Sequence, residues 1–228
     1  GYSVSSAGDV NGDGIDDLII GTLEYNYYGQ FLGRAYVVFG SADPTRDDMD
    51  LGNLSPADGF TIVGQWLGGY TGSSVSDAGD INGDGIGDLI IGAPYGGAAR
   101  EGEAYVIFGT AGATRADIDL ANLAARDGFV IGGDGIVGNT GYSVSSAGDA
   151  NGDGLDDLLV GAPEYSFYYA DADRTYVIFG KAGATRADID LANLAASDGF
   201  VIESAAYGDR VGFSVSDAGD VNGDGIAD

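Results

Sequence analysis

Apolar residues occur along the chain in short runs that are separated by turns rich in Gly, Asp and Asn. Runs such as Leu18-Ile19-Ile20 and Tyr105-Val106-Ile107-Phe108 are apolar at successive positions. Each run therefore predicts a strand that is covered on both faces, because a sheet with one face in water would alternate apolar and polar residues.

The pattern repeats along the whole chain. Gly-Asp-X-Asn-Gly-Asp-Gly occurs four times, at steps of 71, 69 and 71 residues, with its first Asp at Asp9, Asp80, Asp149 and Asp220. These steps predict three complete repeats and the start of a fourth, at approximately 1–71, 72–140, 141–211 and 212–228.

Each complete repeat predicts four short strands between turns. The expected strands are Tyr2–Ala7, Asp17–Gly21, Ala35–Phe39 and Gly59–Val63, then Ser73–Ala78, Asp88–Gly92, Ala104–Phe108 and Gly128–Ile131, then Tyr142–Ala147, Asp157–Gly161, Thr175–Phe179 and Gly199–Ile202, and finally Phe213–Ala218. A four-stranded sheet that repeats in series and is covered by its own copies is a β-propeller blade. The predicted fold is all-β, a partial propeller of antiparallel blades. The stretch Asp117–Leu123 fits either a short helix or an irregular connector.

Charge and composition exclude several function classes. The chain has 36 acidic and 9 basic residues among 228, a formal charge of −27, which repels nucleic acids and anionic lipid surfaces. With no Cys and no His it has no disulfide, no Ser-His-Asp triad and no imidazole-bound metal. No apolar run approaches the ~18 residues of a membrane span, so we expect no membrane insertion. The chain opens at Gly1 and is expected to be a piece of a longer protein.

The acidity is concentrated in the repeated loops DVNGDGIDD, DINGDGIGD, DANGDGLDD and DVNGDGIAD, which hold 14 of the 36 acids. Oxygen-bearing side chains stand at positions 1, 3, 5 and 9, Gly at position 6 allows a tight turn, and the carbonyl at position 7 adds an oxygen. Hard oxygen ligands favour Ca²⁺, with Mg²⁺ the weaker alternative. Ordinary turns or an adaptation to salt are the other interpretations. The variable position 8 is expected to point outward.

The order SVSDAGDINGDGIGDLIIGAP over Ser74–Pro94, followed by an aromatic strand that ends in Phe108-Gly109, closely resembles the FG-GAP repeat of integrin α-subunit propellers and of many bacterial secreted proteins. The resemblance covers the whole chain. "GAP" is Gly92-Ala93-Pro94 in the second repeat and Gly161-Ala162-Pro163 in the third, but the first repeat has Gly21-Thr22-Leu23. The opening "FG" is degenerate.

This resemblance implies a propeller, seven-bladed in the family, with Ca²⁺ in the loop between the first two strands of a blade. The implied ligands are Asp9, Asn11, Asp13, Ile15 (carbonyl) and Asp17; Asp80, Asn82, Asp84, Ile86 and Asp88; Asp149, Asn151, Asp153, Leu155 and Asp157; and Asp220, Asn222, Asp224, Ile226 and Asp228. The fourth site is expected to be incomplete, because the chain ends at its last ligand.

The expected function is an extracellular calcium-binding module, secreted or on the cell surface, for adhesion or for binding a protein or glycan. In related propellers the loop between strands two and three lies opposite the calcium loops. In this chain that loop carries the aromatic candidates for ligand contact, Tyr25, Tyr27, Tyr28, Tyr95, Tyr165, Tyr168 and Tyr169. Alternatively, some of these rings pair across a hairpin or fill gaps between blades.

Two other functions stay open. The chain could be a structural spacer in a large secreted protein, or a non-catalytic accessory part of a calcium-dependent polysaccharide-active enzyme. We expect no enzyme activity, because no paired carboxylates or Tyr-Arg pairs stand at suitable spacings outside the acidic loops. Three blades and a fraction do not close a propeller. The remaining blades of the parent propeller, or further copies of this chain, are therefore expected partners.

Overall fold

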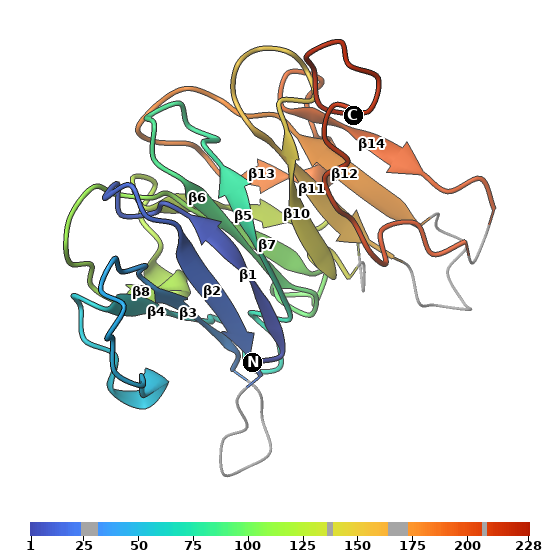
Figure 1. Ribbon diagram of the computed structural model, residues 1–228. Coiled ribbons are helices and arrows are strands. Elements are labelled where there is room, and N and C mark those ends of the chain that lie inside the picture. Colours follow the sequence, from blue (N-terminus) through green and yellow to red (C-terminus); the bar gives the residue numbers. More distant parts are fainter. Residues whose placement is uncertain (24–31, 136–138, 164–172, 207–208) are drawn as a thin grey trace.

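The computed structural model describes residues 1–23, 32–135, 139–163, 173–206 and 209–228 (Figure 1). Three antiparallel sheets follow one another along the chain. Blade 1 contains β1 (Ser3–Gly8), β2 (Asp17–Thr22), β3 (Arg34–Val38) and β4 (Gly59–Val63); blade 2 contains β5 (Ser74–Gly79), β6 (Asp88–Ala93), β7 (Glu103–Ile107) and β9 (Gly128–Gly132); blade 3 contains β10 (Ser143–Gly148), β11 (Asp157–Ala162), β12 (Arg174–Ile178) and β14 (Gly199–Glu203).

A fifth strand is added to two of the sheets by the following repeat. β8 (Ile118–Asp119) pairs in parallel with β4, and β13 (Ile189–Asp190) pairs in parallel with β9. Both lie in the connector between the third and fourth strands of a repeat, residues 43–53, 112–122 and 183–193, which we call the strap. Each strap ends in one turn of 3-10 helix: η1 (Leu51–Asn53), η2 (Leu120–Asn122) or η3 (Leu191–Asn193). The open alternatives for Asp117–Leu123 therefore resolve into a short strand and a 3-10 turn.

The hydrophobic core lies between the blades, in two clusters. On β6, Leu89 and Ile91 pack with blade 1, whereas Ile90 packs with blade 3. All six residues of β6 are buried, because successive side chains of a strand point to opposite faces. This arrangement confirms the prediction that consecutive apolar residues belong to strands covered on both faces.

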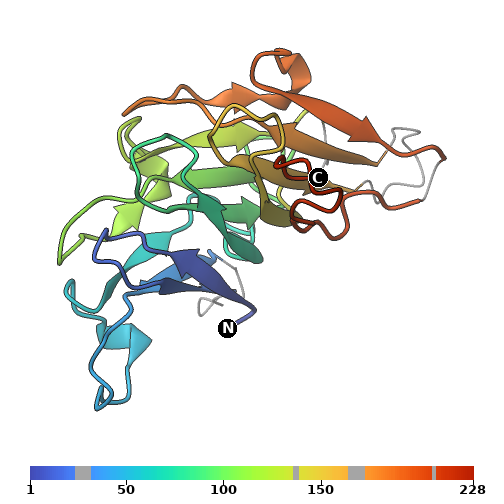
Figure 2. The ribbon, with the colours of Figure 1, turned by 45° about the horizontal axis from the view of Figure 1, so that its top comes forward.

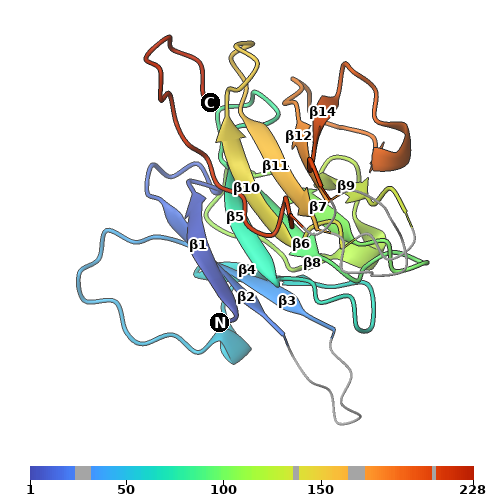
Figure 3. The ribbon, with the colours of Figure 1, turned by 90° about the vertical axis from the view of Figure 1, so that its right-hand side faces the viewer.

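The first strands of the blades lie side by side, β1 beside β5 and β5 beside β10 (Figures 1 and 3). Figure 2 shows the three sheets stacked as successive blades. The stack is open at both ends. On blade 1, Val4 is 69% and Leu18 is 50% exposed, and on blade 3 Phe200 is 47% exposed. The fold is a partial β-propeller, as the sequence predicts.

The predicted strands differ from the observed ones by a residue or so at their ends, with one exception. Phe213–Ala218 is not a strand. In the other repeats this segment pairs with the second strand, as β1 pairs with β2, and here the sequence ends at Asp228 before that strand. Within the described ranges, no helix has the length and apolar character needed to cross a membrane.

Candidate functional site

The acidic loops join the first and second strands of each blade. Each of the three complete loops begins after a β-bulge, which in blade 1 lies between Ser6 and Gly8. Gly12 and Gly14 have φ angles of 72° and 85°, a region that favours glycine, and the corresponding glycines of the other three loops have similar values. The spacing of Gly in the sequence thus determines how the loop turns back on itself.

Within the first loop, side-chain oxygens accept hydrogen bonds from the loop backbone. The Oδ1 of Asp9 accepts from Asp13 N at 3.0 Å and its Oδ2 accepts from Gly14 N at 2.7 Å. The Oδ1 of Asn11 accepts from Asp13 N at 2.9 Å, and the Oδ1 of Asp13 accepts from Ile15 N at 2.9 Å. The second, third and fourth loops repeat these bonds. The nonapeptide therefore holds its shape through its own Asp and Asn side chains.

The carboxylate at position 9 is buried in each complete loop, at Asp17, Asp88 and Asp157. Asp88 accepts from Ile81 N at 3.1 Å and from Gly109 N at 2.8 Å, so it ties the loop to the end of the third strand. Burial raises the pKa of Asp88 to about 8 despite these two bonds, and the nearby carboxylates of Asp84 and Asp80 raise it further. The pKa values of Asp17 and Asp157 are raised for the same reasons.

This donor set fits a hard divalent cation in its chemistry. Each complete loop contributes at least three carboxylates and one amide oxygen, and a carboxylate oxygen that accepts one N–H bond keeps a second lone pair. In the part of the chain that the structure describes, no three acidic side chains meet closely enough to hold one metal ion. Many of the loop oxygens instead accept hydrogen bonds from backbone N–H groups.

The loops also bind the next repeat through their backbone carbonyls. Asp9 O accepts from Gly87 N at 3.0 Å, Val10 O from Thr110 N at 2.9 Å and Asn11 O from Gly112 N at 2.9 Å. The second loop accepts corresponding bonds from the third repeat. The sequence does not indicate this contact, because it joins residues about 75 to 100 positions apart that share no local pattern.

Position 8 of the loop corrects one expectation. Asp156, which was expected to point outward, turns its Oδ2 toward the preceding loop and accepts from Asp80 N at 2.8 Å. Its backbone N also donates to Asp80 O, at 3.4 Å. The backbone N–H groups of Gly87 and Ala227, at the same position, likewise donate to Asp9 O and Asp149 O of the preceding loops. The residue at this position can vary because its backbone makes the contact.

The fourth loop keeps the internal bonds but differs at position 9. Asp228 accepts from Val221 N at 2.9 Å and from Asn222 N at 3.1 Å, and its side chain is exposed. The other position 9 residues accept their second bond from a glycine after the third strand, Gly40, Gly109 or Gly180. The fourth loop is therefore less enclosed than the other three.

The opposite ends of the strands carry an aromatic cluster. The rings of Tyr70 and Tyr95 meet with centroids 5.1 Å apart, and those of Tyr142 and Phe213 are 4.9 Å apart. Burial raises the pKa of Tyr95, and its neighbours Tyr70, Tyr142 and Tyr2 add to the rise. The candidates Tyr25, Tyr27, Tyr28, Tyr165, Tyr168 and Tyr169 lie outside the described residues. The described cluster is at the starts of β1, β5 and β10, away from the acidic loops (Figure 1).

Half-buried polar groups occupy the same end of the blades. Trp66 Nε1 donates to Glu103 Oε2 at 2.8 Å, and the hydroxyl of Tyr105 also donates to Glu103. Burial raises the pKa of Glu103 in spite of these two donors. In blade 3 the matching position is Arg174, which pairs with Asp134. The two blades therefore place opposite charges at one structural position.

Successive four-stranded blades, each with an acidic loop between its first two strands, define this protein as a partial propeller built from one repeated unit. The FG-GAP repeat family matches residues 1–38, 71–107 and 140–178, half of the chain. The chain belongs to this family.

Curated relatives include two kinds of protein. Integrin alpha pat-2 of Caenorhabditis elegans is 34% identical over 175 residues, which are 71% of this chain and 13% of that protein. Integrin alpha-5 of Xenopus laevis is 32% identical over 167 residues, 71% of this chain and 14% of that protein. Phosphatidylinositol-glycan-specific phospholipase D of Rattus norvegicus is 30% identical over 170 residues, 72% of this chain and 18% of that protein. The matched regions are thus less than a fifth of each of these relatives.

Proposed function

We propose that this chain is an extracellular calcium-binding propeller module for adhesion or for binding a protein or glycan. The observation that supports calcium best is the buried carboxylate at position 9, whose pKa is raised by burial and by the other loop acids. A divalent cation would offset that repulsion. Membership of the FG-GAP family and similarity to integrin alpha proteins support the binding function.

In the middle loop the ion would be held by the side chains of Asp80, Asn82, Asp84 and Asp88 and by the carbonyl of Ile86, and the other loops would use the corresponding residues. Calcium supplies two positive charges to each loop, so four ions would change the formal charge from −27 to −19. The loop carbonyls accept hydrogen bonds from the next blade, so an ordered loop stiffens the junction between blades. Oxygen-ligand calcium sites include weak extracellular modules, which are filled at millimolar calcium.

Calorimetric titration tests the calcium sites. Chelator-treated protein titrated with calcium chloride should show three similar sites and a weaker fourth, because Asp228 is exposed. Millimolar calcium should raise the melting temperature, and magnesium at the same concentration should raise it less. Identical melting curves in calcium and in chelator would contradict the proposal.

For ligand binding we propose the aromatic end of the blades. Tyr95 offers a ring, packed against Tyr70, with a hydroxyl at its tip, a combination that favours interfaces. Replacing Tyr95 with Ser should weaken capture of the glycan or protein that the wild type retains on an array by roughly thirtyfold, as truncation of a central contact costs about 2 kcal/mol. Calcium-dependent melting should stay the same. A variant that binds undiminished would favour a structural spacer instead.

A second candidate function is a non-catalytic part of a larger secreted enzyme. The similarity to proteins named phosphatidylinositol-glycan-specific phospholipase D favours it. In this case too we propose that the chain itself carries no catalytic residues. Purified chain should release no product from a glycosylphosphatidylinositol substrate or from polysaccharides, and turnover by this chain alone would overturn that part of the proposal.

A further inference from the structure

We propose that each acidic loop is completed by one carboxylate of the following repeat, which strengthens cation binding in the loop that it faces. Asp77 serves the first loop, Asp156 the second and Asp217 the third. Each of these residues lies outside the nonapeptide of the loop that it serves. The inference rests on the proposed calcium function, and it extends each site across the junction between two repeats.

The sequence places one acid at every such junction. Two positions of a repeat face the preceding loop: the residue three before the first Asp of the acidic loop, and position 8 of that loop. In the four repeats these two positions hold Ser6 and Asp16, Asp77 and Gly87, Ser146 and Asp156, and Asp217 and Ala227. Each repeat therefore has one acid, at one position or the other. Two positions that supply the same charge indicate that the charge itself is required.

Between blades 2 and 3 the acid is Asp156, which holds the first ligand residue of the second loop on both sides. Its Oδ2 accepts from Asp80 N at 2.8 Å, and its backbone N donates to Asp80 O at 3.4 Å. A Cβ atom on Gly79 would clash with this Oδ2, so glycine leaves the room that the carboxylate needs. The carboxylate thus belongs to the third repeat but lies against the backbone of the second loop.

Between blades 1 and 2 the acid comes from the strand before the loop. Position 8 is Gly87, which has no side chain. Asp77, at the β-bulge of β5, accepts from Gly79 N through its Oδ1 at 2.8 Å. The same Oδ1 lies 3.2 Å from the place of a Cβ atom on Gly8, the residue that corresponds to Gly79. Asp77 therefore reaches the place at the first loop that Asp156 occupies at the second.

The junction between blade 3 and the fourth repeat follows the arrangement of Asp77. Asp217 Oδ1 accepts from Gly219 N at 2.8 Å and lies 3.9 Å from the place of a Cβ atom on Gly148. In the third repeat the same bond is made by a neutral group, since Ser146 Oγ accepts from Gly148 N at 3.1 Å. The bulge therefore does not require a carboxylate, and the charge of Asp77 or Asp217 is left for the neighbouring loop.

The charge acts on a cation in two ways. A carboxylate beside the loop attracts a divalent cation directly, and Asp156 also holds Asp80 in place through its backbone. Asp77 and Asp156 are half-buried, so water screens them less than a surface charge. Burial raises the pKa of Asp77, and the carboxylates of Asp156 and Asp16 add to the rise. The junction carboxylates therefore repel one another in the metal-free chain, and cations in the adjacent loops offset this repulsion.

Calcium titration followed by amide NMR of the whole chain tests the proposal loop by loop. The position 6 glycine of every loop donates its N–H to the first Asp of that loop, so Gly14, Gly85, Gly154 and Gly225 report the four loops separately. Asp156→Asn keeps an oxygen acceptor for Asp80 N but loses the charge. The calcium concentration that half-saturates the second loop should rise roughly fivefold, and less at high salt. The third loop, which contains residue 156, should change little.

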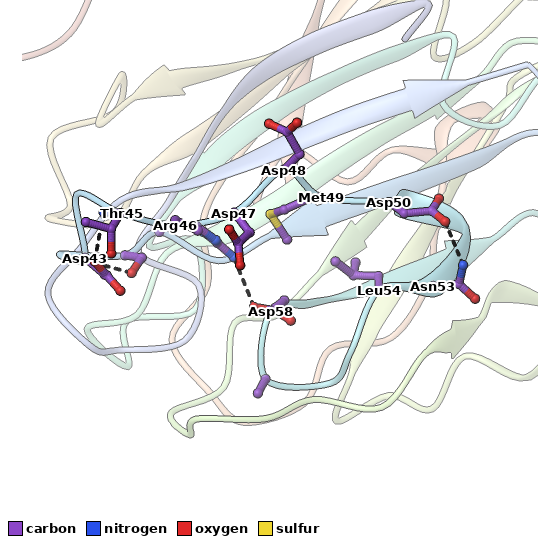
Figure 4. A pocket seen from close by; sticks show the side chains of 13 residues that line it. Asp43, Thr45, Arg46, Asp47, Asp48, Met49, Asp50, Asn53, Leu54 and Asp58 are labelled. Atoms are coloured by element: carbon purple, nitrogen blue, oxygen red, sulfur yellow. Dashed lines mark hydrogen bonds and ion pairs between the residues drawn. The ribbon is translucent and has the colours of Figure 1, made fainter.

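Asp50→Asn is the charge-matched control. Asp50 is exposed in the strap of the first repeat, where it accepts from Gly52 N at 2.9 Å and from Asn53 Nδ2 at 2.6 Å (Figure 4). Asn is also a good capping residue, so the strap should keep its turn. All four loops of this variant should bind calcium as in the wild type.

An exchange of positions separates the charge from the fold of the loop. Asp156→Gly gives the third repeat the position 8 residue of the second repeat, and it should weaken the second loop at least as much as Asp156→Asn. Adding Ser146→Asp to Asp156→Gly recreates the pair of Asp77 and Gly87 at this junction. This double variant should recover most of the calcium affinity of the second loop.

An unchanged second loop in Asp156→Asn, or equal weakening of the second and third loops, would overturn the proposal. A double variant that binds no more tightly than Asp156→Gly would overturn it as well. If calcium leaves the four reporter glycines of the wild type unchanged, the proposed calcium function itself is wrong, and this result is seen without any variant.

Discussion

Ionisation of the buried carboxylate of Asp88 should affect the stability of the chain, and replacing this residue should have opposite effects with and without calcium. Its ordinary pKa is 3.8 and its pKa in the folded chain is about 8. A raised pKa in an acid means that stability is highest at low pH and falls as the pH rises from about 4 to about 8. At pH 7 without metal, the loss is on the order of 4 kcal/mol, at about 1.4 kcal/mol per pKa unit.

The variant Asp88→Asn removes this cost because its amide does not ionise. It also loses one acceptor, since Asp88 accepts from both Ile81 N and Gly109 N and an amide has one oxygen. An unsatisfied buried N–H group costs about 1–3 kcal/mol. In chelator at pH 7 the variant should therefore be more stable than the wild type by roughly 1–3 kcal/mol, and in saturating calcium it should be less stable.

Urea unfolding at pH 4, 6 and 8, in chelator and in calcium, measures both effects. The stability gained by Asp88→Asn in chelator should grow as the pH rises, because only the wild type gives up stability over this range. Asp119→Asn, at an exposed residue in the strap of the same repeat, controls for the loss of one negative charge. If Asp88→Asn is destabilised in chelator at every pH, the carboxylate is a structural hydrogen-bond acceptor and its ionisation does not lower the stability of the metal-free chain.

Two further predictions concern the junction between blades 1 and 2 and the half-buried Glu103 of blade 2. Arg115→Ala should destabilise the chain by about 1–2 kcal/mol in urea unfolding, because it uncovers the ring of Phe60. The control Arg126→Ala, at an exposed arginine, should have little effect. Equal effects of the two variants would count against the cation–π contact. Burial raises the pKa of Glu103, so wild-type stability should fall as the pH rises through that pKa, and Glu103→Gln should remove this dependence. The fluorescence of Trp66, the single tryptophan, reports the titration of Glu103. If Glu103→Gln shows the same pH profile as the wild type, the prediction is wrong.

The repeat, most of the strands and the shape of the acidic loops could be predicted from the sequence. These features depend on local chemistry: Gly12 and Gly14 take positive φ angles, and the side chains of Asp9, Asn11 and Asp13 bond to backbone groups within a few residues. Runs apolar at successive positions also predicted that both strand faces are covered. A repeated local pattern is readable because each copy specifies the same short-range bonds.

The contacts between successive repeats could not be predicted from the sequence and are seen in the folded chain. The pairing of Ile118 with Ile62, the contact of Asp156 with the preceding loop and the gathering of Tyr70, Tyr95 and Tyr142 join residues far apart in sequence. Strand formation is itself a tertiary property, which is why the predicted strand Phe213–Ala218 is not one: a strand exists through its hydrogen-bonded neighbour, and neither local propensity nor hydrophobic pattern can supply that neighbour.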